Sequence, residues 1–141
     1  CGLLGPDVLM NSGFPRNFSE EEFRCKCNAK HCNGTFPHSD RIRFLAWCLQ
    51  RVRDICGPIT INSAYRCVGH NKAVGGASGS QHPLCTAADI VCADKSPDQV
   101  AFVVKELMET GIIPNGGLGQ YDTFTHIDIR ASKARWDNRS K

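Results

Sequence analysis

Residues 80–92 decide the interpretation of this chain, and they read Ser80-Gln81-His82-Pro83-Leu84-Cys85-Thr86-Ala87-Ala88-Asp89-Ile90-Val91-Cys92. The run Ala87–Cys92 is typical of a buried strand. Pro83 argues against a helix that joins His82 to Asp89, so we expect His82 on the loop that enters the strand. An unpaired carboxylate in such a strand would be costly, so Asp89 needs a cation or several hydrogen-bond donors.

A polar stripe follows in the last strand of the sequence pattern. Strands are predicted at roughly Gly117–Tyr121 and Phe124–Arg130, joined tightly through Asp122-Thr123. Side chains alternate between the two faces of a strand, so Thr125, Ile127 and Ile129 would point to the core. The opposite set would point into a cleft, and it comprises Phe124, His126, Asp128 and Arg130.

His82, Asp89 and His126 together have the side chains of a catalytic zinc site. Two imidazoles and one carboxylate leave a fourth position open for water, whereas structural zinc is more often closed by four Cys or His ligands. If the three residues converge, the sequence predicts a hydrolase with one catalytic Zn²⁺.

Helical patterns frame these strands. Ser19 and Glu22 form a capping box at the start of a short helix within Asn17–Phe23. Longer amphipathic helices are predicted from Ser39 to about Cys56 and from the N-cap Ser96 to about Thr110. A further strand is expected at Ile59–Ala64, and residues 66–86 hold a glycine-rich loop with at most one helical turn.

The predicted fold class is α+β, with two main helices packed against a small, largely antiparallel sheet. A chain of 141 residues forms one domain. Residues 1–16 are expected to be an extended lead-in and residues 17–141 a single domain.

Composition argues against two classes of partner. The net charge of +3 is too small and too dispersed for nucleic-acid binding. No apolar run approaches the ~20 residues of a membrane helix. No signal peptide is visible in Cys1–Pro6, although a chain that begins at Cys1 can already be a mature form. We expect a monomer.

Nine cysteines are an unusual number for this length. Their density predicts several disulfides and a secreted protein, and their odd count leaves at least one thiol unpaired. Two alternatives stay open. The thiols can be reduced, or Cys25, Cys27, His31 and Cys32 can form a structural metal site with tighter spacing than a usual zinc finger.

Four short motifs occur in order, namely Ile61-Asn62-Ser63-Ala64-Tyr65-Arg66-Cys67, Ser80-x-His82, Ala87-Ala88-Asp89-Ile90 and Tyr121-x-Thr123-Phe124-x-His126-Ile127-Asp128. Their order and spacing resemble the zinc D-Ala-D-Ala carboxypeptidase group, the M15 peptidases, which share their fold with the Hedgehog signalling domain. The resemblance covers about Asn17 to Trp136. It implies a zinc held by His82, Asp89 and His126, and cleavage beside D-amino acids in peptidoglycan stems.

The same resemblance suggests catalytic groups beyond the metal ligands. Arg66 matches the family's active-site arginine, and its guanidinium suits a substrate carbonyl oxygen or carboxylate. Ser80 and Gln81 are expected to contact substrate or to support the ligands. Where this chain has Cys85, many relatives carry glycine.

The general base is less well defined by the pattern. Several relatives have a glutamate three residues before the last metal histidine, where this chain has Thr123, and others use the position of Tyr121. The nearest carboxylates are Asp122 and Asp128, of which we rank Asp122 first.

The sequence therefore predicts peptide-bond hydrolysis by a zinc-activated water outside the cell. Arg66 and Tyr121 would stabilise the oxyanion, and Asp122 would handle the proton. The substrate would be the terminal D-Ala-D-Ala bond or an internal bond of a peptidoglycan stem. A non-catalytic zinc-containing wall-binding module is the main alternative, and a cysteine hydrolase using His70 or His31 is a third.

Overall fold

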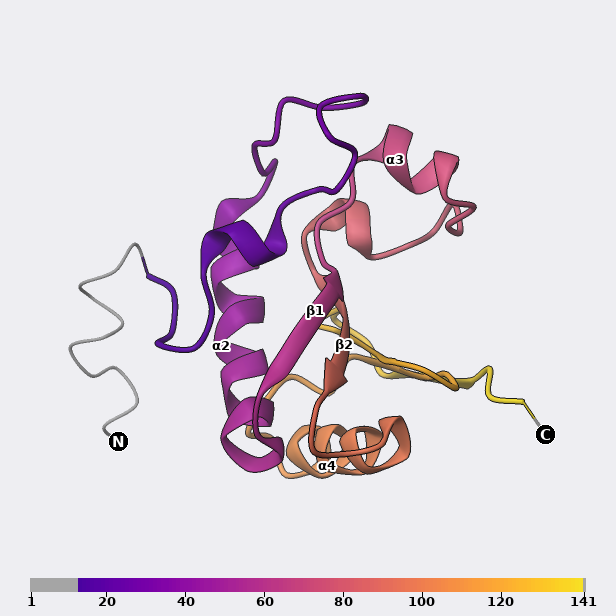
Figure 1. Cartoon of the computed structure of the whole chain (residues 1–141). Helices are drawn as coiled ribbons and strands as arrows, with labels where there is room; N and C mark the ends of the chain where they lie inside the picture. The colour runs from indigo at the N-terminus through magenta and orange to yellow at the C-terminus, as the bar shows by residue number, and fades with distance from the viewer. Residues whose placement is uncertain (1–12, 141) are drawn as a thin grey trace.

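A five-stranded sheet forms the centre of the computed structural model, which describes residues 13–140 (Figure 1). The strands are β1 (Ile59–Ser63), β2 (Ala87–Cys92), β3 (Gly117–Gln120), β4 (Thr125–Asp128) and β5 (Ala134–Asp137), in the spatial order β1-β2-β4-β3-β5. Neighbouring strands are antiparallel except β3 and β5, which run parallel. The predicted α+β class with a largely antiparallel sheet is confirmed.

Two long helices pack on the sheet. Helix α2 (Ser39–Cys56) contacts β2, and α4 (Pro97–Glu109) contacts β2, β3, β4 and α2. Figure 1 shows α2 alongside β1, with α4 across the lower end of the two labelled strands. Both helices match the predicted ranges closely, because their apolar residues recur at helical spacing and are buried.

Side chains of these helices and of the sheet form the core between them. Its members are apolar and nearly all fully buried, and they include Ile42, Leu45, Leu49, Val52, Ile90, Val100, Val104 and Ile127. An aromatic cluster extends this core toward the start of the described chain, where Phe14 and Phe18 pack on Phe23. Residues 13–16 of the predicted lead-in therefore contact the domain, and residues 1–12 lie outside the described range.

Short helical turns occupy the remaining connections. The first predicted helix is a 3₁₀ turn, η1 (Glu20–Phe23), in which Ser19 N donates to Glu22 Oε2 over 2.9 Å. The glycine-rich region contains α3 (Val68–Ala73) and a second 3₁₀ turn, η2 (His82–Leu84).

Strand β5 is not among the strands predicted from the sequence. Its residues, Ala134-Arg135-Trp136-Asp137, contain no β-branched side chain, and their burial does not alternate. The strand exists because it pairs with the edge of β3, a tertiary contact that local propensity does not encode.

The predicted disulfides are not formed in residues 13–140. All eight cysteines in this range are free, and Cys1 lies outside it. The sulfurs of Cys27 and Cys32 are 3.5 Å apart, well beyond the bond length of about 2.05 Å.

No helix in the described part of the chain is long and apolar enough to cross a bilayer.

Candidate metal centre

The pairing of β2 with β4 places Asp89 directly opposite His126. Their side chains lie on the sheet face away from α4, because Thr125 and Ile127 occupy the helix side and Thr125 Oγ1 donates to Pro97 O over 3.1 Å. His126 Nδ1 is 3.0 Å from Asp89 Oδ1. The alternation expected for this strand is thus what brings imidazole and carboxylate together.

His82 reaches the same point from η2, as expected for a loop entering β2. Its Nε2 lies 3.3 Å from Asp89 Oδ2, and its Nδ1 lies 2.7 Å from Ala64 O. A carbonyl oxygen only accepts, so Nδ1 carries a hydrogen and Nε2 is the ring nitrogen that faces Asp89. The side chain is 3% exposed, so this tautomer is held by buried contacts.

His126 uses the opposite ring nitrogen. Its Nε2 is 2.8 Å from Asp128 Oδ2, which leaves Nδ1 free to face Asp89. Asp128 is fully buried and accepts from Gly117 N as well as from Nε and Nη2 of Arg130. Burial alone would raise the pKa of Asp128, but the hydrogen bonds from Arg130 and His126 outweigh it and lower the pKa.

These three residues suit a zinc ion. One ligand atom from each of His82, Asp89 and His126 lies within 4.8 Å of the others. Burial would raise the pKa of Asp89, yet hydrogen bonds with His126 and His82 prevail and lower it to about 2. A zinc ion bound here would take the place of the hydrogens between Asp89 and the two ring nitrogens that face it. Two imidazoles whose other nitrogens are already bonded, beside an ionised carboxylate, form the donor set that zinc prefers.

A cleft of about 610 Å³ contains all three candidate ligands. Its other described lining residues come from two stretches, 66–81 and 121–136, and they are Arg66, Val74, Gly75, Gly76, Ala77, Gly79, Ser80, Gln81, Tyr121, Phe124, Arg130 and Trp136. Arg66, Ser80, Gln81 and Tyr121 were expected from the sequence. No described cysteine lines the cleft, so the cysteine-hydrolase alternative gains no support.

Arg66 and Tyr121 each have a hydrogen-bond donor that is available to a ligand. Arg66 Nε is buried without a hydrogen-bond partner among the described residues. The Tyr121 hydroxyl accepts from Trp136 Nε1 over 2.9 Å, and the Tyr121 ring stacks on Phe124 with centroids 4.3 Å apart. Since an indole N–H only donates, the Tyr121 hydroxyl hydrogen is available to another acceptor.

Ser80 and Gln81 are bonded within the loop that carries His82. Ser80 Oγ accepts from His82 N over 3.1 Å, and Gln81 Oε1 accepts from Thr86 Oγ1 over 2.9 Å. These contacts stabilise the loop conformation that places His82 in the cleft.

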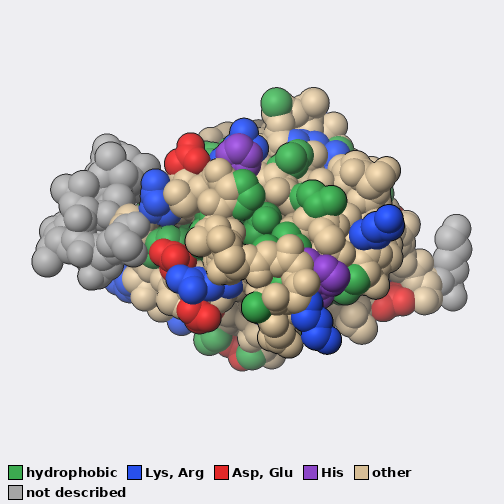
Figure 2. Space-filling model, turned by 90° about the horizontal axis from the view of Figure 1, so that it is seen from above, with side chains coloured by type: hydrophobic (Ala, Val, Ile, Leu, Met, Phe, Trp, Pro, Cys, Tyr) green, Lys and Arg blue, Asp and Glu red, His purple; other side chains and the backbone are tan. Residues whose placement is uncertain are grey.

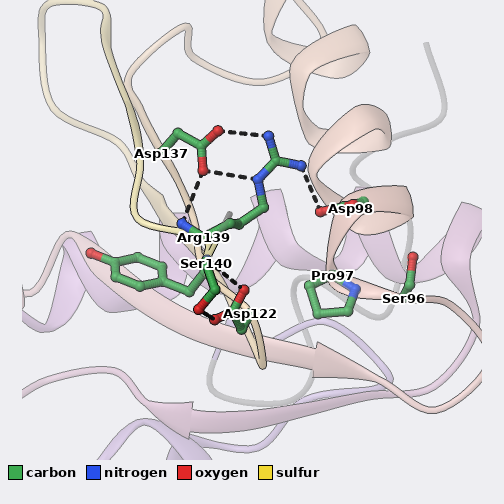
Figure 3. Close-up of a pocket in the computed structure, with 8 residues that line it drawn as sticks. Ser96, Pro97, Asp98, Asp122, Asp137, Arg139 and Ser140 are labelled. Carbon is green, nitrogen blue, oxygen red and sulfur yellow. Dashed lines mark hydrogen bonds and ion pairs between the residues drawn. The ribbon is translucent and has the colours of Figure 1, made fainter.

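Asp122 lies apart from the ligands. Its carboxylate accepts from Ser140 N over 2.9 Å and Ser140 Oγ over 2.6 Å, in a neighbouring pocket where Arg139 bonds Asp137 and Asp98 (Figure 3). It does not line the cleft that contains His82. To act on a group in that cleft, Asp122 would first have to leave Ser140.

Trp136 and two glycines of β3 are functional candidates that sequence reasoning missed. Strand register aligns Asp89, His126, Gly119 and Trp136 across β2, β4, β3 and β5. A side chain at Gly119 would collide with Trp136, whose ring lies 4.9 Å from that of His126. Alternating glycines in a short strand were the available signal, since they indicate a close approach of neighbouring groups.

The backbone conformation at Cys85 explains why glycine, which many relatives carry here, suits this position. It has φ of 64° at the end of η2, in the left-handed region that favours glycine. Its thiol is fully buried and does not line the cleft. Cys85 therefore does not fill the open position of the metal centre.

Comparison with known proteins agrees with this geometry. Residues 16–128 match the family described as Peptidase M15. The zinc D-Ala-D-Ala carboxypeptidase of Streptomyces albus G is 33% identical over 118 residues, which cover 80% of this chain and 46% of the relative. The chain thus spans about half the length of that relative. Because the family match includes most of the chain and all three candidate ligands, the chain belongs to the Peptidase M15 family.

Proposed function

We propose that this chain hydrolyses peptide bonds in the stems of bacterial peptidoglycan, with one zinc ion held by His82, Asp89 and His126. The observation that carries the proposal is the convergence of these donors in a cleft that also contains Arg66, whose Nε has no partner among the described residues. When bound, zinc would polarise the scissile carbonyl and lower the pKa of a water to about 7.

Arg66 would hold the acyl oxygen or terminal carboxylate of the substrate. A guanidinium presents several donors in a fixed plane and stays charged at all working pH values. Among the described lining residues Asp89 is the sole carboxylate; Arg66 has an Nε without a described partner, whereas the charge of Arg130 is paired with Asp128. This balance favours an anionic peptide end, and we therefore propose terminal D-Ala release over internal scission.

Tyr121 would donate its hydroxyl hydrogen to the developing oxyanion or to the leaving amine. The contact from Trp136 supports this assignment, because it uses an acceptor lone pair of the hydroxyl and leaves its hydrogen free. Asp128 and Arg130 would act indirectly by holding His126 in the required tautomer.

The relative's name motivates the choice of substrate, and action on a wall substrate implies that the chain works outside the cytoplasm. The test is mass spectrometry of purified muropeptides incubated with the protein, with and without a zinc chelator. We expect chelator-sensitive loss of one alanine from pentapeptide stems, and no loss with Asp89→Asn.

An internal cut would keep the peptidase and correct the bond. Unchanged muropeptides with zinc bound at this centre would contradict hydrolysis. That result would favour the wall-binding module, to which the absence of a second carboxylate among the described lining residues also points.

A further inference from the structure

Four thiols gather at a second place in the molecule, outside the cleft. One sulfur from each of Cys25, Cys27, Cys32 and Cys67 lies within 4.8 Å of the others. Three of these cysteines come from the loop between η1 and α2, and Cys67 is the N-cap of α3. We propose that these four cysteines bind a structural Zn²⁺ ion as thiolates.

The spacing of the sulfurs matches a tetrahedral zinc site. Zinc–sulfur bonds of about 2.3 Å in a tetrahedron place sulfurs about 3.8 Å apart. The observed separations include 3.5 Å between Cys27 and Cys32 and do not exceed 4.8 Å. These distances are compatible with the tetrahedral value, and all four cysteines are free of disulfide bonds.

Backbone N–H groups donate hydrogen bonds to two of the four sulfurs. Cys67 N donates to Cys25 Sγ and His70 N donates to Cys67 Sγ, each over 3.3 Å. Such donors favour the thiolate, which is the form that binds a metal. The structure also replaces His31 of the sequence alternative with Cys67, which gives a four-sulfur set that is typical of structural zinc.

The loop that carries three of the proposed ligands is not stabilised by regular secondary structure. Residues 24–38 form neither helix nor strand. Asn28 and Ala29 have φ of 55° and 63° in the turn between Cys27 and Cys32, and the left-handed region costs a residue with a Cβ roughly 1–2 kcal/mol. A metal that joins both ends of this turn supplies the binding energy that offsets such a cost.

Apolar side chains pack together on the same side of the molecule as the four cysteines. Figure 2, viewed from the side of this loop and α3, shows several hydrophobic side chains near the centre, with acidic and basic ones mostly around them. Phe36 packs against Tyr65 with ring centroids 5.9 Å apart, and Tyr65 N donates to Phe23 O over 3.1 Å.

Arg66 lies between Tyr65 and Cys67, so the proposed metal would tie residues 24–38 to the segment that carries the cleft arginine. The cysteine site would thus position Arg66 without contacting substrate.

The first test counts metal ions. Native mass spectrometry of the protein, purified under reducing conditions, should find two zinc ions per chain. The variant Cys27→Ser/Cys32→Ser should retain one, and His82→Ala/His126→Ala should also retain one. The control Cys48→Ala removes a buried thiol outside the cluster and should retain two.

A second measurement uses the unaltered chain, in case the cysteine variant does not fold. Replacing zinc with Co²⁺ should produce sulfur-to-cobalt charge-transfer absorption, which ligation by His82, Asp89 and His126 cannot give. Its absence from cobalt-loaded protein would overturn the proposal. So would an intact mass showing that these cysteines have lost two hydrogens per disulfide. Loss of the histidine-bound zinc alone would count against the proposed peptidase and leave the cysteine site standing.

Discussion

His82 and His126 present different ring nitrogens to Asp89, and the partner of the other nitrogen decides which. Ala64 O fixes the hydrogen of His82 on Nδ1, and Asp128 fixes that of His126 on Nε2. A backbone carbonyl cannot be removed by substitution, whereas Asp128 can. The ligand set is therefore most vulnerable on the β4 side.

Asp128→Asn should weaken zinc binding at the histidine centre by roughly 10- to 100-fold. The amide can no longer accept from His126 and pair with Arg130 as a carboxylate does. Chelator competition would measure the affinity. Asp122→Asn is the matched control and should keep both zinc and activity, because Asp122 bonds Ser140 instead of lining the cleft. If Asp122→Asn retained zinc and lost turnover, Asp122 would be the general base after all.

Arg66→Ala should reduce turnover by roughly 100- to 1,000-fold, in the range for loss of one oxyanion-stabilising donor. Its zinc content should be unchanged, because Arg66 is not among the grouped ligands. Rates on muropeptides, paired with metal analysis, would check both statements. Arg51→Ala on α2 serves as the control for removing a positive charge. Equal rates for Arg66→Ala and unaltered protein would exclude Arg66 from the reaction.

At the scale of elements, β3 alternates two glycines with the larger residues Leu118 and Gln120, and the glycines leave room for side chains of the neighbouring strands. Gly117 faces the Asp128 carboxylate and Gly119 faces the Trp136 ring, and a Cβ at either position would overlap these groups. The strand thus leaves the space in which β4 and β5 place their side chains.

Gly119→Ala should destabilise the fold by about 1–3 kcal/mol through overpacking. It should also change tryptophan fluorescence, because the added methyl must displace the Trp136 ring. Urea unfolding followed by fluorescence would measure both effects. Gly79→Ala is the control, since no described atom lies within 4 Å of its added Cβ. A Gly119→Ala protein as stable as the control would show that β5 is not packed against β3 in this way.

Elements with strong internal patterns could be predicted from the sequence. Helices α2 and α4 follow from apolar spacing, and β2 follows from its apolar run. The alternation of the two strands could be predicted as well, but the meeting of Asp89 with His126 also needs the register of β2 with β4. Features that depend on distant contacts could not be predicted in this way. Trp136 is positioned by pairing with β3, and Asp122 is turned away by Ser140 after the chain returns along β5.

The cysteines show the same limit. Spacing along the chain suggested His31 as the partner of Cys25, Cys27 and Cys32, because it is their neighbour in sequence. The structure instead brings in Cys67, whose position depends on the connection from β1 to α3. Density of cysteine alone predicted disulfides, and only the three-dimensional arrangement distinguishes four separate thiols from two bonded pairs.

At the scale of the whole molecule, helix α4 and the candidate metal site lie on opposite faces of the sheet. Helix α4 packs against β2, β3 and β4 and buries their apolar side chains. The other face carries His126, Asp89 and the surrounding cleft. Substitutions within the cleft can therefore alter metal affinity or turnover while the helix-side core stays intact.

The position of β5 after the three candidate ligands in the sequence has a consequence for the nascent protein. During translation, His82, Asp89 and His126 all emerge from the ribosome before Trp136, which completes the row across the sheet. The three candidate ligands can therefore be present before the Trp136 ring that lies beside His126. The hydrogen bond between Trp136 and Tyr121 therefore forms only after residues 134–137 have been synthesised, and a chain arrested before residue 134 would lack this contact at the cleft.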